Sequence, residues 1–81
     1  MDKREIIMKM ENIFSEIFDK DDICLTDESS SDSIEGWDSL AHIQIVNSIQ
    51  KVFGIKINAR EMMEWNNVGD MVETIKQKIN D

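Results

Sequence analysis

The sequence predicts an all-α fold: a small four-helix bundle of three longer helices and one short one, with a long loop between the first two helices. Three stretches repeat apolar residues at spacings of three and four, which is the period of a helix. No stretch shows the apolar–polar alternation of a strand. The length of 81 residues suits a single small domain, spanning residues 1–81.

The first predicted helix begins after Asp2 and ends near Asp19. Asp2 is a suitable N-cap, with Glu5 three residues later as its partner. Seven apolar residues form one broad stripe along this helix: Ile6, Ile7, Met10, Ile13, Phe14, Ile17 and Phe18. The stripe predicts that one face of the helix is buried.

Residues 19–38 lose the helical period and are predicted to form a solvated loop. They include eight acidic residues, one lysine and a run of serines. Long loops inside small domains are often functional. We expect the apolar members of this loop to hold it against the core: Ile23, Leu25, Ile34 and Trp37.

The second predicted helix begins at Asp38 or Ser39 and ends near Phe53. Gly54 follows directly and suits the left-handed residue just past a helix end. The predicted inward stripe contains Leu40, Ile43, Val46, Ile49 and Phe53. Ile45 and Val52 lie off this stripe, so we expect them to offer partners an apolar contact.

Two shorter patterns predict the remaining helices. Asn58 and Glu61 have the spacing of a capping box at the start of a short helix, which would reach the core through Met62 and Trp65. Asn67 is a suitable cap for the last helix. The predicted buried face of that helix contains Met71, Val72, Ile75 and Ile79.

Composition argues against several kinds of protein. One His and one Cys cannot supply the four ligands of a structural zinc site, and one Cys cannot form an internal disulfide. Asp19, Asp21 and Asp22 suggest a calcium loop only weakly, because Ile23 and Cys24 stand where that motif needs a ligand and a glycine. We therefore expect no metal.

The charge and hydropathy of the chain also bear on its partners and location. A net charge of −8 argues against a nucleic-acid partner. No stretch approaches the ~20 apolar residues that cross a bilayer, so we expect no membrane insertion. The charged N-terminus is unlike a signal peptide, which predicts a cytoplasmic protein.

Residues 36–40, Gly-Trp-Asp-Ser-Leu, join the acidic loop to the second helix. The stretch DSIEGWDSLAHIQIV, residues 32–46, resembles the signature around the modified serine of acyl carrier proteins. The resemblance continues through KVFGIKINAREM to VGDMVETIKQKI and covers nearly the whole chain. It implies a freestanding carrier that bears 4′-phosphopantetheine on Ser39, transferred from coenzyme A by a separate magnesium-dependent enzyme. Such a carrier holds acyl or aminoacyl groups as thioesters and catalyses nothing itself.

The neighbours of Ser39 have alternative roles. Asp38 is expected to cap the helix, and the resemblance implies that it also takes part in transferase recognition. Leu40 belongs either to the core or to a partner contact. Ser39 and His42 have the spacing of a nucleophile–base pair, but the glycine and strand that accompany a nucleophile elbow are missing. We expect no catalytic residue, and we expect His42 to be an exposed residue near the arm.

The resemblance implies three kinds of partner: a phosphopantetheinyl transferase, an acyl- or aminoacyl-activating ligase, and downstream biosynthetic enzymes. The chain is expected to be a monomer. Its second helix reads SLAHIQIVNSIQKVF, with no carboxylate and one lysine, unlike the acidic helix of fatty-acid carriers. This difference favours a specialised pathway, such as a polyketide-like, lipid or polysaccharide-related one. The alternative is an unmodified helical interaction module that binds a basic partner through its acidic loop.

The isoleucine-rich core also bears on the cargo. Close-packed interiors contain few voids. We therefore expect little ready-made cavity and, at most, transient sheltering of short acyl groups.

Overall fold

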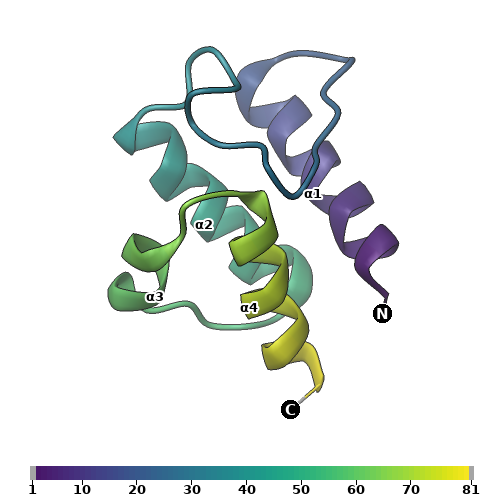
Figure 1. Cartoon of the computed structure of the whole chain (residues 1–81), viewed down its shortest axis with the longest axis vertical. Helices are drawn as coiled ribbons and strands as arrows, with labels where there is room; N and C mark the ends of the chain where they lie inside the picture. Colours follow the sequence, from purple (N-terminus) through teal and green to yellow (C-terminus); the bar gives the residue numbers. More distant parts are fainter. Residues whose placement is uncertain (1, 81) are drawn as a thin grey trace.

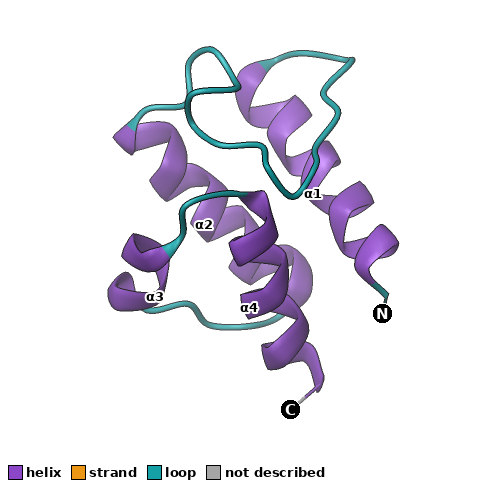
Figure 2. Ribbon diagram, in the orientation of Figure 1, coloured by secondary structure: helices purple, strands orange, loops and turns teal. Residues whose placement is uncertain are grey.

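The computed structural model describes residues 2–80 and contains four helices and no strand within that range (Figure 2). The helices are α1 (Lys3–Phe18), α2 (Ser39–Phe53), α3 (Ala59–Glu64) and α4 (Val68–Asn80). This arrangement confirms the predicted all-α bundle with three longer helices and one short one. The predicted domain also includes Met1 and Asp81, which lie outside the described residues.

The three longer helices surround the core, and α1 packs against both α2 and α4 (Figure 1). The short α3 lies beside α2 and α4, and the loop of residues 19–38 crosses the end of the bundle above them (Figure 1). None of the helices in the described part of the chain is long and apolar enough to cross a bilayer. The most deeply buried side chains are Ile6, Met10, Phe14, Ile45, Ile49, Val68, Met71, Val72 and Ile75.

The predicted helix ends are confirmed. Each N-cap side chain accepts a hydrogen bond from a backbone N–H of the first turn, which satisfies one of the free donors there. The distances are 2.9 Å for Asp2, 2.8 Å for Asp38, 2.8 Å for Asn58 and 2.9 Å for Asn67. At the other end, α1 and α2 stop at residues with left-handed backbone, Asp19 and Gly54.

The predicted inward stripe of α2 is partly wrong. Leu40 and Ile43 are 65% and 48% exposed. The buried row instead runs from Ala41 through Ile45 to Ile49, at a spacing of four residues. The small Ala41 carries little weight in an apolar pattern, but it allows close packing at the start of the helix. The face of α2 that carries Leu40 and Ile43 is therefore exposed to solvent.

This rotation also changes the expected partner contacts on α2. Ile45 is completely buried, so the expectation that it contacts partners is wrong. Val52 is 48% exposed, as expected for a residue off the core face. Phe53 and Val46 pack with the core as predicted.

The loop of residues 19–38 is held to the core by its apolar residues, as predicted. Leu25 is buried, and its backbone N–H donates to the Glu11 carboxylate at 2.9 Å. Ile23, Ile34 and Trp37 are half-buried against the core. The loop is thus fixed on α1 near its start and on the core near its end.

The middle of the loop is also bonded to the start of α4. The carbonyl oxygens of Ser29 and Asp27 accept hydrogen bonds from the backbone N–H groups of Val68 and Gly69, at 2.8 and 2.9 Å. A Cβ at Gly69 would lie 3.0 Å from the Asp27 carbonyl oxygen, so the close approach depends on glycine. Lys3 adds a salt bridge to Asp27 at 2.6 Å. These contacts place the rest of the loop, and its junction with α2, on a fixed support.

Candidate functional site

Ser39 is the first residue of α2, and its side chain is exposed. The chain enters the helix through Gly36, whose φ of 92° favours glycine, and through Asp38, which caps the helix on the Ala41 amide. Leu40 follows Ser39 and is also exposed. The structure therefore places all three predicted site residues on one surface at the N-terminus of α2.

An open pocket of about 420 Å³ lies beside Ser39. The loop, α2 and α3 each contribute to it, so its walls come from segments far apart in the sequence. This volume falls within the range of small-molecule sites. It is open to solvent and is therefore distinct from the interior cavity that the expectation of a close-packed core concerns. Its lining residues are Ser31, Trp37, Asp38, Ser39, His42, Ile43 and Met62.

His42 is half-buried in an aromatic cluster, so the expectation of an exposed side chain is wrong. The Trp37 indole Nε1–H donates to His42 Nδ1 at 3.2 Å, and the two rings stack with centroids 6.0 Å apart. The Trp65 ring contacts the imidazole edge-on, and the centroids of these two rings are also 6.0 Å apart. Trp37 in turn packs edge-to-face on Phe14, at 5.1 Å. These contacts fix the imidazole between the loop, the core and the segment after α3.

A second, smaller pocket of about 70 Å³ shares Trp37 and His42 with the first. It extends from the aromatic cluster toward Trp65 and Met71. Its volume is far below that of typical ligand sites. The site therefore consists of an open pocket beside Ser39 and a small adjoining pocket, lined by the loop, the aromatic cluster and the segment before α4.

Four residues of the pocket were not assigned to the site by sequence periodicity: Ser31, Trp37, Ile43 and Met62. Ser31 belongs to the serine run of the loop, which forms a local turn between Ser30 and Ser33 and is bonded to the start of α4 through Ser29. Met62 was predicted only as a core contact of α3, but it also faces the pocket. Two tryptophans close to a helix with a single histidine are the one sequence signal that could have indicated the cluster.

The polar groups of the site do not form a nucleophile–base pair. The Nδ1 atom of His42 is occupied by Trp37, and no hydrogen bond joins His42 to Ser39 within the part of the chain described. In residues 2–80, no group of three or more His, Cys, Asp or Glu side chains has the arrangement of a metal site. Ser39 is therefore an exposed hydroxyl at a helix start, with an open pocket beside it.

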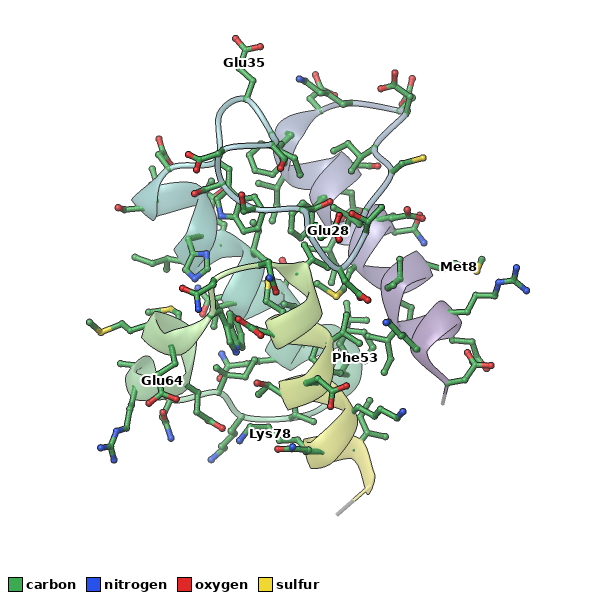
Figure 3. All side chains as sticks on the ribbon, viewed as in Figure 1. Met8, Glu28, Glu35, Phe53, Glu64 and Lys78 are labelled. Atoms are coloured by element: carbon green, nitrogen blue, oxygen red, sulfur yellow. The ribbon has the colours of Figure 1, made fainter. Side chains whose placement is uncertain are left out.

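The electrostatics of the surrounding surface are uneven. On α2, Gln44 and Asn47 are exposed and neutral, whereas Glu35 of the loop projects outward into solvent (Figure 3). Gln50 of the same helix is half-buried, and its side chain accepts a hydrogen bond from the Ile57 N–H at 2.8 Å. The exposed surface of α2 beyond Ser39 therefore contains no carboxylate and one lysine, Lys51, next to an acidic loop.

Glu61 anchors α3 at the edge of the site. Its carboxylate accepts from the Asn58 backbone N–H at 3.1 Å and forms a salt bridge with Lys78 of α4 at 3.0 Å. The Asn58 N–H is the main reason that the pKa of Glu61 lies below its usual value, and Lys78 lowers that pKa further. These interactions help to hold α3, and with it Met62, beside α2.

Comparison with known proteins agrees with this geometry. The chain is 30% identical over 77 residues to the acyl carrier protein of Thermotoga maritima, covering 95% of both chains. It is 33% identical over 78 residues to that of Borreliella burgdorferi, covering 96% of this chain and 98% of the relative.

Two solved structures have the same fold. The holo acyl carrier protein from Geobacter metallireducens superposes with a TM-score of 0.85 at 34% identity, over 91% of this chain and 85% of that one. The crystal structure of the Thermotoga maritima acyl carrier protein gives a TM-score of 0.86 at 25% identity, over 99% of this chain and 93% of that one. Residues 8–75 match the family model described as the phosphopantetheine attachment site. The chain therefore belongs to the acyl carrier protein family, whose phosphopantetheine-binding domain carries covalently attached 4′-phosphopantetheine.

Proposed function

We propose that this chain carries acyl or aminoacyl intermediates on a 4′-phosphopantetheine arm attached to Ser39, and presents them to biosynthetic enzymes. The thiol at the end of the arm supplies the thioester chemistry, and the chain's own residues position the arm. A phosphopantetheinyl transferase installs the arm, and an acyl- or aminoacyl-activating ligase loads it. The chain itself contributes no catalytic residue.

The observation that carries this proposal is the exposed Ser39 hydroxyl at the start of α2. The backbone N–H groups of Ser39 and Leu40 donate to no protein acceptor within residues 2–80. Free N–H groups at a helix N-terminus, together with the helix dipole, favour an anion. A phosphodiester on Ser39 Oγ fits this environment, and the neighbouring pocket offers space for the chain beyond it.

A mass measurement tests the attachment. The unmodified protein is incubated with coenzyme A, magnesium and a broad-specificity transferase, and its intact mass is recorded. We expect the addition of one phosphopantetheine group, lost in Ser39→Ala. Ser31→Ala is the matched control, because Ser31 is an exposed serine of the same pocket and should leave the addition intact. No addition with several transferases would favour the unmodified interaction module.

We also propose that the chain serves a specialised pathway. The support is the surface of α2, where Gln44 and Asn47 are exposed and neutral and Leu40 and Ile43 are exposed and apolar. Steering by complementary charge should be weak on such a face. Supporting a general bacterial fatty-acid synthase at full rate, with the salt dependence of an acidic carrier, would contradict this proposal.

The remaining expectations are proposals of the same kind: one domain over residues 1–81, a monomer, and a cytoplasmic location. Neither Met8 nor Val52, both exposed and apolar, lines the pocket beside Ser39. Isolated exposed apolar residues are normal on monomers. Light scattering on the purified protein measures its mass in solution, and a mass twice that of the chain would contradict the proposed monomer.

A further inference from the structure

The imidazole of His42 is held in one orientation by Trp37 and Trp65. Neither the capping of α2 nor the packing of the core explains these contacts. An indole nitrogen is only a donor. The bond from Trp37 Nε1 to His42 Nδ1 therefore needs Nδ1 to be an acceptor, and the neutral imidazole carries its proton on Nε2. Stacking on Trp37 and the edge contact with Trp65 restrict rotation of the ring. His42 thus offers one oriented donor, the Nε2–H.

This donor has no hydrogen-bond partner among residues 2–80. The hydrogen bonds formed by the described residues do not include Nε2 of His42. A half-buried N–H group gains from a hydrogen bond to an acceptor, especially to a charged one. His42 lines the pocket beside Ser39, which has room for such an acceptor.

Ser39 and His42 are three residues apart on α2, and such residues are neighbours on a helix surface, with Cβ atoms about 5–6 Å apart. A phosphodiester on Ser39 Oγ extends the side chain by one further group. The N–H groups of Ser39 and Leu40 belong to the same first turn of α2. His42 lines the same pocket as Ser39 and the capping residue Asp38. Among the described residues, Asp38 is the only acidic one that lines the pocket.

We propose that His42 is a positioning residue that donates a hydrogen bond from Nε2 to a phosphodiester oxygen of the arm. The inference rests on the proposed attachment at Ser39. The bond holds the base of the arm over the pocket, and Trp37 sets the tautomer and the direction of the donor. The neutral and protonated imidazoles both carry the Nε2 proton, but only the neutral form keeps the bond from Trp37.

The test uses the fact that His42 is the only histidine in the chain. In protein labelled with ¹⁵N-histidine, the Nε2–H proton is observed before and after modification, with attachment confirmed by intact mass. We expect its exchange with water to slow at least about tenfold in the modified form. We also expect a ¹⁵N–³¹P correlation across the hydrogen bond. Unchanged exchange, or no correlation, in protein whose mass shows the arm would overturn the inference while leaving the attachment standing.

Variants separate this bond from simple packing. In the modified protein, His42→Leu should move the ³¹P signal, and His42→Gln, which keeps an N–H donor, should restore it at least in part. Gln44→Leu changes an exposed residue on another face of α2 and should leave the signal unchanged. A ³¹P signal that is the same in His42→Leu, or equally displaced in His42→Gln, would also overturn the inference. Failure of every form to accept the arm would instead contradict the proposed function.

Discussion

The indole Nε1–H of Trp37 donates a hydrogen bond to Nδ1 of His42 at 3.2 Å, and the two rings stack at an angle of 19°. One residue lies at the end of the loop and the other in the first turn of α2, with Ser39 between them in sequence. The bond therefore closes a link across the N-terminus of the helix that bears the proposed attachment site. It also connects that terminus to the core, because Trp37 packs on Phe14.

Trp37→Phe removes this bond and keeps most of the aromatic packing. We expect the free energy of unfolding to fall by about 1 kcal/mol, the net value of a typical hydrogen bond. Denaturant unfolding measures it. A double-mutant cycle with His42→Leu should give a coupling energy of about 0.5–1.5 kcal/mol. Additive effects of the two substitutions would show that the contact contributes nothing to stability.

Substitutions of Asp38 separate helix capping from partner recognition. Asp38→Asn keeps a good cap and should change stability by no more than a few tenths of a kcal/mol, whereas Asp38→Ala should cost about 1 kcal/mol. If the carboxylate also contacts the transferase, Asp38→Asn should lower kcat/KM of modification roughly tenfold, the loss of one charge-assisted hydrogen bond. A stable Asp38→Asn protein that is modified at the normal rate would limit Asp38 to capping.

Leu40 and Ile45 lie on the same helix but should behave oppositely. Leu40 is 65% exposed, so Leu40→Ala should leave the free energy of unfolding within about 0.5 kcal/mol of its original value while slowing loading by partner enzymes. Ile45 is fully buried, and Ile45→Ala should cost about 2–5 kcal/mol. Met8→Ala, at an exposed apolar residue of α1, is the control for loading. Equal loading rates for Leu40→Ala and Met8→Ala would contradict a role for Leu40 in partner recognition.

The link between Glu61 and the rest of the protein should depend on pH. The pKa of Glu61 is lowered in the folded protein, mainly by the Asn58 N–H and then by Lys78. Its stabilising contribution is therefore present above the usual glutamate pKa and is lost as the pH falls through the lowered value. The pair is partly exposed, so we expect Glu61→Gln to cost less than about 1 kcal/mol at neutral pH.

That difference between Glu61→Gln and the original protein should shrink on acidification, as followed by thermal unfolding at several pH values. The control is Glu64→Gln, whose carboxylate is 72% exposed and lies 3.9 Å from Arg60. A difference that grows toward low pH would contradict the assignment of the lowered pKa to these contacts.

Local sequence signals predicted the helices and their ends well. The caps at Asp2, Asp38, Asn58 and Asn67 act on amides within their own first turn, so a short window of sequence contains all the information needed. The left-handed end of α2 at Gly54 is equally local. The prediction of the buried face of α1 was correct because the apolar stripe of this helix is broad. A small error in the rotation of the helix about its axis therefore leaves the same residues buried.

The errors concern contacts between segments far apart in the sequence. The side of α2 that is buried depends on where α1 packs, so the spacing of apolar residues alone could not choose between Leu40 and Ala41. The burial of His42 depends on Trp65, more than twenty residues later. The pocket depends on the placement of the loop by α4. Its lining could not be derived from any local pattern, whereas the position of Ser39 at a helix start could.

The most direct test of the attachment is to locate the added group by fragmentation of the modified protein in a mass spectrometer. The chain contains seven serines, four of them in the loop at positions 29–33, so the intact mass alone does not identify the modified one. We expect every fragment that contains Ser39 to carry the phosphopantetheine and every fragment that ends before it to lack the group. Finding the group on a loop serine, with Ser39 unmodified, would contradict the proposed attachment.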